Sequence, residues 1–319
     1  KRKIPCYTLD NLYQEARHMN DIQNIINNIE AWGYSVNARV LFSNFINSLE
    51  TKCGNDDAMR HILQIIDEIV LGKEKEQFMK IIEPGMQFYR ARIIDASDDG
   101  CLEKGIGITS EGKYVGYNEE NSKEPIIGIS SNGRNNIAGA SYLYIASNPE
   151  TACMEIKSQF GDLISLATFQ INEPIKIIDF ASDKEFQTSD SKNYGIALGV
   201  LFTQLMLRFM EPVKETNAYK ATQIISDHLR KTGIDGIAYK SFLSPSGINY
   251  TIFNCHSSKI KYCESKIVIH KQANHSFWDL NAEKEIMSNR EEKEMKWNSE
   301  VAGKLKRKLS ERIQIINSK

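Results

Sequence analysis

Alternation of apolar and polar residues predicts a strand followed directly by a helix near the centre of the chain. Residues 141–146 place Leu143 and Ile145 on one face and two tyrosines on the other, the period-two pattern of a strand. Asn148, Pro149 and Glu150 then predict a helix start, because they supply a capping side chain, a proline at the first helical position and an acid in the first turn. The rest of the chain is interpreted around this unit.

Glu155 falls on the side of this predicted helix that carries Ala152 and Ile156. A carboxylate turned toward a core loses hydration, so it must be paired, protonated or used. Geometry by itself favours a plainer interpretation, an acid at the rim of the helix that reaches water or bonds to a nearby loop. Both interpretations stay open at this point.

Helical periodicity predicts an all-helical segment before the strong break at Pro84-Gly85. The expected helices cover residues 10–31, 37–51, 56–72 and a short stretch before that break. Arginine and histidine are adjacent at 17–18 and at 60–61, which turns them to different helix faces and argues against a ribonuclease. Packing, docking or oligomerisation is the expected role.

Residues 86–94 predict the first strand of a second domain, with Arg90 and Arg92 on one face. Two arginines on one face suit an anion such as a phosphate, and salt bridges within the domain are the equal alternative. The glycine-rich residues 95–132 predict a long loop, which in a compact domain is usually functional or a lid.

The remaining pattern predicts strands at 163–171 and 174–180, helices at 194–210 and 222–232, and paired strands at 237–239 and 249–254. Ser241 stands where a strand gives way to a loop, a usual place for a substrate contact and equally for a turn hydroxyl. Beyond residue 272, an apolar residue every fourth position, with lysines and arginines between, predicts an amphipathic helix that packs on its own protein or on a second copy.

Composition describes an ordinary soluble protein. The 319 residues include 40 basic and 41 acidic side chains, so no global charge favours nucleic acid, and no apolar run is long enough to cross a bilayer. Six cysteines without a C-x-x-C pair indicate reduced thiols and a cytoplasmic setting, and no complete metal-ligand set is recognised.

Three stretches of the second domain resemble the RES domain family, named for its Arg, Glu and Ser. They are FYRAR at 88–92, GRNNIAGASYLYIASNPETACMEI at 133–156, and the block 219–253 with ATQIISDHLRKTGIDGIAYKS and GINYTIF. The resemblance implies an α+β fold, a split, mostly antiparallel β core of ADP-ribosyltransferase-like type with flanking helices. The predicted organisation is a helical N-terminal domain at 1–83, which resembles HEPN-like domains, a RES domain at 84–272 and a helical extension at 273–319.

RES proteins are bacterial toxins of toxin–antitoxin pairs that consume NAD⁺, so the resemblance implies cleavage of the nicotinamide–ribose bond by hydrolysis or phosphorolysis. NAD⁺ would be the substrate and no further cofactor or metal is implied. A helix-turn-helix antitoxin is the implied partner, and the helical ends could make a homo-oligomer. Alternatives are an ADP-ribosyltransferase, a non-enzymatic interaction protein, a solitary NADase in anti-phage defence and a secreted effector.

The resemblance assigns the chemistry to Glu155, Arg90 and Ser241. Glu155 would hold the nicotinamide ribose or orient the attacking water, since a carboxylate stabilises an oxocarbenium-like centre. Arg90 would bind the diphosphate, and Ser241 the nicotinamide amide or a ribose hydroxyl. Supporting arginines and aromatic-wall candidates are Arg92, Arg134, Tyr89, Tyr117, Tyr142 and Tyr144. Asn135-Asn136-Ile137 departs from the family's usual residues after Gly-Arg and is expected to alter the pocket lip.

Overall fold

The computed structural model describes residues 22–50, 56–73, 75–95, 103–110, 112–159, 161–182, 192–212, 219–253 and 258–270. The predicted extension at 273–319 lies outside these residues. The helices are α2 (Ile22–Glu50), α3 (Asp56–Leu71), α4 (Glu119–Ser122), α5 (Pro149–Glu155), α6 (Lys192–Met210) and α7 (Lys220–Lys231), with a 3₁₀ turn η1 (Lys75–Gln77). No helix among the described residues combines the length and apolar character needed to cross a membrane.

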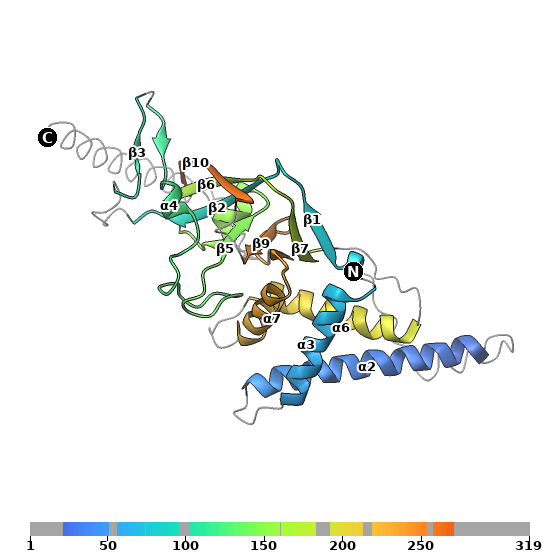
Figure 1. Ribbon diagram of the computed structural model, residues 1–319. Helices are drawn as coiled ribbons and strands as arrows, with labels where there is room; N and C mark the ends of the chain where they lie inside the picture. Colours follow the sequence, from blue (N-terminus) through green and yellow to red (C-terminus); the bar gives the residue numbers. More distant parts are fainter. Residues whose placement is uncertain are drawn as a thin grey trace, which may run out of the picture. The chain divides into compact units, whose positions relative to one another are not determined.

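Eight strands form one sheet in the order β1-β7-β8-β9-β5-β2-β6-β10 (Figure 1). Their bounds are β1 (Met79–Ile82), β2 (Gln87–Ile93), β5 (Leu143–Ala146), β6 (Leu163–Ile171), β7 (Ile175–Phe180), β8 (Gly236–Lys240), β9 (Ile248–Ile252) and β10 (Ile260–Ile269). The pairs β8–β9, β9–β5, β5–β2, β2–β6 and β6–β10 are antiparallel. The predicted α+β class with a mostly antiparallel sheet is therefore confirmed.

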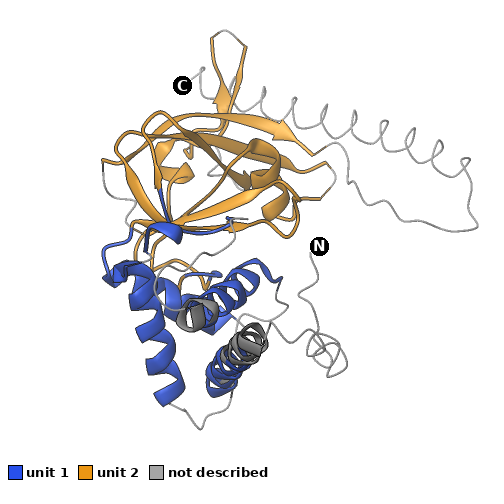
Figure 2. Ribbon diagram, turned by 90° about the vertical axis from the view of Figure 1, so that its right-hand side faces the viewer, with its two compact units in different colours: residues 1–80, 133–135, 178–234 blue, residues 81–132, 136–177, 235–319 orange. Residues whose placement is uncertain are grey.

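The chain divides by packing into two compact units (Figure 2). Unit 1 comprises Lys1–Lys80, Gly133–Asn135 and Ile178–Ile234, and unit 2 comprises Ile81–Asn132, Asn136–Ile177 and Asp235–Lys319. Helices α6 and α7 pack with the N-terminal helices in unit 1, so the units do not follow the order of the chain, and the domains predicted at 1–83, 84–272 and 273–319 stay a prediction.

Unit 1 is built on helix packing and a group of phenylalanines. Helix α2 packs against α6 and α3, and α3 also contacts α7. The rings of Phe180 and Phe209 are stacked with centroids 4.7 Å apart, and Phe202 contacts both Phe180 and Phe78. These aromatic contacts join the C-terminal half of α6 to strand β7 and to the segment before β1.

Helix α2 corrects the prediction of two helices divided near Gly33. A glycine within a helix costs about 1 kcal/mol relative to alanine, so it favours a break without enforcing one. Ala38, Phe42 and Phe45 are buried, and the packing of α2 on α6 and α3 outweighs that local cost. The helix therefore continues through Gly33 as one 29-residue element.

Two other segments also differ from the sequence prediction. The short helix expected before Pro84 is instead η1 followed by strand β1, whose Ile82 is buried at the edge of the sheet next to β7. Strand β10 was not predicted at all. Charged residues interrupt its alternation, and its register with β6 shifts between Tyr262 and Glu264, so the period-two signal is broken.

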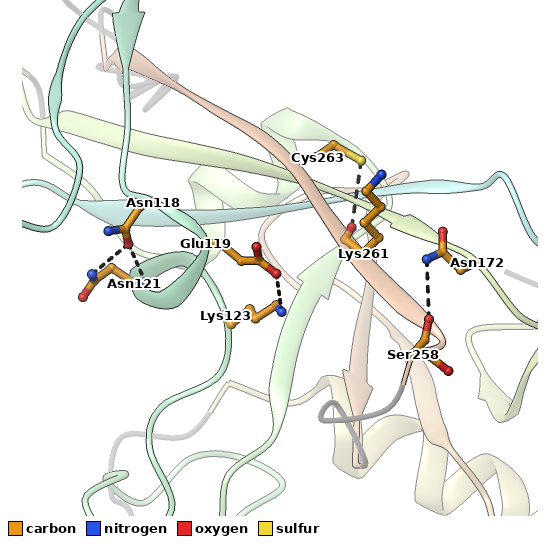
Figure 3. A network of polar contacts seen from close by, with 8 residues as sticks. All are labelled: Asn118, Glu119, Asn121, Lys123, Asn172, Ser258, Lys261 and Cys263. Atoms are coloured by element: carbon orange, nitrogen blue, oxygen red, sulfur yellow. Dashed lines mark hydrogen bonds and ion pairs between the residues drawn. The ribbon is translucent and has the colours of Figure 1, made fainter.

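The expected loop at 95–132 contains local structure of its own. Two short strands, β3 (Gly107–Ile108) and β4 (Tyr114–Val115), form a small hairpin. The Asn118 side chain then caps α4 by accepting from the backbone and the side-chain amides of Asn121 (Figure 3). Lys123 pairs with Glu119 across the same turn (Figure 3).

Candidate functional site

The predicted strand-to-helix unit is present and lies within unit 2. Strand β5 pairs with β9, which places Ala146 opposite Asn249. Helix α5 begins at Pro149, and the Asn148 side chain accepts a hydrogen bond of 2.8 Å from the backbone amide of Thr151. Since α5 has only two turns, its last residue, Glu155, is held close to the sheet on which the helix packs.

Ser241 organises the loop that connects β8 to β9. Its hydroxyl oxygen accepts from the backbone amides of Leu243 at 3.1 Å and Ser244 at 3.0 Å. The loop is closed by a bond from the Ser241 amide to the carbonyl of Gly247. The Thr151 hydroxyl donates to the Ser244 hydroxyl at 3.1 Å, which fastens the loop to α5.

Glu155 is where these elements meet. Its Oε1 accepts from the Ser241 hydroxyl at 2.6 Å and from the Asn249 Nδ2 at 2.7 Å, while no described residue donates to Oε2. Glu155 is exposed, not turned into the core, so the plainer interpretation of an acid at the helix rim bonded to a loop describes its position. The result is a carboxylate fixed by one oxygen and open at the other.

Asn249 was missed by the sequence analysis. It is 7% exposed and is the second residue of β9, the strand that follows the Ser241 loop. An isolated asparagine in a predicted strand carries no signal of its own. Its pairing with Ala146, three residues before the start of α5, brings it to Glu155, and a single sequence does not contain that register.

Arg90 lies at the junction of β2 and β5. The two strands are joined at the single residue pair Tyr89–Ala146. Just beyond it, the Arg90 guanidinium donates to the Tyr144 carbonyl at 3.2 Å. Residues paired across neighbouring strands lie on the same sheet face, so Tyr89, Ala146 and Asn249 form one row. Arg90 follows Tyr89 on β2, and its side chain therefore leaves the sheet on the opposite face.

Arg92, two residues after Arg90 on β2, shares its face of the sheet. Its guanidinium donates to the Lys123 carbonyl at 2.7 Å. Burial lowers the pKa of Arg92, against the opposing influence of Tyr117 and Glu124. This side chain binds backbone next to the capped turn of α4.

The four tyrosine candidates have distinct surroundings. Tyr117 and Tyr142 are buried, at 7% and 5% exposure, and Tyr142 packs on the Phe253 ring with centroids 5.1 Å apart. The Tyr144 hydroxyl donates to Asn136 Oδ1 at 2.7 Å. Tyr89 packs beside Ala146 and Ala152 in the small apolar cluster under α5.

The Asn135-Asn136-Ile137 departure has a structural role at Asn136. Its Nδ2 lies 3.0 Å from the carbonyls of Ser131, Ile137 and Ala140, which fixes the turn beneath Tyr144. Arg134 belongs to unit 1 instead. There its guanidinium donates to the Glu211 carbonyl at 2.6 Å and lies 5.3 Å from the centre of the Tyr219 ring.

Comparison with known proteins bears on these residues. The family model described as RES domain matches residues 117–273, a range that includes Glu155, Ser241 and Asn249 and begins after Arg90. Among solved structures, the crystal structure of the M. tuberculosis MbcT-MbcA toxin-antitoxin complex is similar over 65% of this chain and 92% of that chain, with 11% identity and a TM-score of 0.35. No curated protein matches.

No part of these comparisons tests the HEPN-like resemblance of residues 1–83, which stays a prediction. The family match covers the carboxylate, the serine loop and the strand that follows it. Residues 117–273 therefore resemble the RES domain family, and this part of the chain contains the Glu155 site.

Proposed function

We propose that the chain is an NAD⁺-degrading toxin that cleaves the bond between nicotinamide and ribose. The observation that carries the proposal is the Glu155 carboxylate, held through Oε1 by Ser241 and Asn249 and open at Oε2, within the part of the chain that matches the RES domain model. RES proteins are NAD⁺-consuming toxins by the resemblance set out above. An antitoxin with a helix-turn-helix domain is then the proposed partner.

The reaction requires the protein to position the substrate and to stabilise the positive charge that develops on the ribose. Nicotinamide leaves as a neutral molecule, because the electron pair of the breaking C–N bond returns to the cationic ring. The ribose becomes oxocarbenium-like, and a carboxylate stabilises such a centre. A water oxygen bonds to the ribose carbon and its proton goes to solvent, which gives ADP-ribose; phosphate in place of water gives ADP-ribose 1″-phosphate.

The roles proposed for the individual residues combine their positions with the family resemblance. The Glu155 Oε2 is proposed to contact the nicotinamide ribose or the attacking water, because it receives no bond from the described residues. Arg90 is proposed for the diphosphate from the family resemblance, although its side chain leaves β2 on the sheet face opposite to Asn249. Tyr89 and Tyr144 are better wall candidates than the buried Tyr117 and Tyr142.

The test is turnover of NAD⁺ with product identification, in buffers with and without phosphate. The wild type should release nicotinamide, together with ADP-ribose or its 1″-phosphate. Glu155→Gln should lower turnover by at least about 10²-fold, on the scale of losing an electrostatic stabiliser. Glu150→Gln is the matched control, because Glu150 is an exposed acid in the first turn of the same helix.

The products separate the proposal from its alternative. An ADP-ribosyltransferase would transfer the mass of ADP-ribose to a protein and leave little of it free. If intact NAD⁺ is recovered from the wild-type protein in both buffers and no protein is labelled, the proposed function is wrong.

A further inference from the structure

Two donors of different origin converge on one carboxylate oxygen of Glu155. The Ser241 hydroxyl comes from a loop, whereas the Asn249 amide comes from β9, which lies between β8 and β5 within the sheet. Asn249 is paired on one side with Ala146 and on the other with Tyr239, and it is 7% exposed. The amide is therefore fixed by the sheet as well as by its own hydrogen bond.

The Ser241 hydroxyl has no capacity left for a substrate. A hydroxyl has one proton and two acceptor lone pairs. In Ser241 the proton is donated to Glu155, and the oxygen accepts from the amides of Leu243 and Ser244. This arrangement differs from the expected role of Ser241, a direct bond to the nicotinamide amide or a ribose hydroxyl.

We propose that Asn249 is a positioning residue, which with Ser241 anchors Glu155 through Oε1 and directs Oε2 to the reacting ribose. An ionised carboxylate only accepts hydrogen bonds, so Asn249 must present its NH₂ group to Oε1. Asn249 then acts through Glu155 and not on the dinucleotide itself. This inference rests on the proposed function and adds to it the residues that orient its carboxylate.

The kinetic test uses two substitutions at Asn249. Asn249→Ala removes the donor, and kcat should fall about 10- to 100-fold with little change in KM for NAD⁺, because the reacting carboxylate is misplaced while substrate contacts remain. Asn249→Asp keeps the shape but sets one acceptor against another. The loss of kcat in Asn249→Asp should be largest at pH 8 and should shrink as the pH falls, because a protonated aspartic acid can again donate a hydrogen bond to Glu155.

The pH signature is what a merely structural role would not produce. The loss in Asn249→Ala should be the same at every pH, measured relative to wild type. Asn172→Ala is the matched control, because Asn172 is an exposed asparagine whose side-chain amide bonds only the Ser258 carbonyl among the described residues, at 3.5 Å. A rise in KM with kcat retained, or an unchanged rate in Asn249→Ala, would overturn the proposal.

A second measurement does not depend on NAD⁺ turnover. In a double-mutant cycle of urea midpoints, Glu155→Ala and Asn249→Ala should shift the midpoint together by less than the sum of their separate shifts, because each removes the same bond. Additive shifts would show that Asn249 does not hold Glu155. If the cycle shows coupling but the wild type leaves NAD⁺ intact, the proposed function fails while the anchoring of the carboxylate stands.

Discussion

The Glu155 carboxylate illustrates how a site is assembled residue by residue. Its two donors are 86 and 94 positions away in the chain, and both act on the same oxygen. Neither donor is charged, and both bond Oε1, so Oε2 receives no hydrogen bond from the described residues. An exposed acid held in this way matches the plainer of the two interpretations of the helix, an acid at its rim that bonds to a nearby loop.

Cys153 gives a test of local environment at the same scale. It lies in α5, and burial raises the pKa of its thiol, with an opposing influence from Lys266. The thiolate is the reactive form, so at neutral pH iodoacetamide should label Cys153 much more slowly than the exposed Cys263, and the difference should narrow as the pH rises. Peptide mass spectrometry over a time course measures both rates.

The same shift has a consequence for stability with a definite sign. The unfolded thiol ionises near about pH 8.5, whereas folded Cys153 stays protonated to higher pH. The contribution of Cys153 to the free energy of unfolding is therefore fully present below the pKa of the unfolded thiol. It is lost as the pH rises through the higher pKa of the folded thiol. Equal rates of iodoacetamide labelling at Cys153 and Cys263 at neutral pH would contradict the raised pKa of the Cys153 thiol.

Among the elements, the β8–β9 loop depends on close contact with α5. A Cβ added to Gly247 would lie 2.3 Å from the Thr151 hydroxyl oxygen and 2.8 Å from the Ser244 Cβ. Thr151 is fully buried, so the loop must shift. Gly247→Ala should destabilise the protein by about 1–3 kcal/mol, the usual cost of overpacking, and should reduce NAD⁺ turnover by separating Ser241 from Glu155.

A matched glycine makes the Gly247 test specific. Gly107 has open space around the position of an added Cβ, so Gly107→Ala should leave both the urea midpoint and turnover close to wild type. Similar losses in the two variants would show that the loop contact is not the cause.

The elements also show what sequence patterns contain. Strand β5, the cap at Asn148 and helix α3 followed from local signals, because alternation, capping and apolar spacing are set by neighbouring residues. The continuity of α2 and the existence of β10 depend on packing and pairing with distant segments. Glu155 and Ser241 were named from a resemblance, while Asn249 required the β5–β9 register.

For the whole molecule, the packing division has a consequence for truncation. Helix α6 packs on α2, and Phe202 contacts Phe78, so both partners precede residue 84. A fragment of residues 84–272 leaves the buried side chains of α6, such as Leu201 and Leu205, without that cover. We expect it to lack a cooperative thermal transition, or to melt well below the full chain, by circular dichroism.

A longer fragment provides the control. Residues 22–272 keep α2 and α3 and should melt well above the 84–272 fragment. A cooperative transition of the 84–272 fragment at the full-length temperature would show that unit 1 does not need its N-terminal helices.

The distance along the chain between Glu155 and its donors has a further meaning during synthesis. A ribosome that has completed α5 has made the acid but neither Ser241 nor Asn249, and Asn249 is the last of the three to be translated. An unfinished polypeptide therefore lacks the assembled centre. A cell making this protein is exposed to its proposed chemistry only after β9 has emerged and folded into the sheet, which leaves an interval in which a newly made chain is harmless.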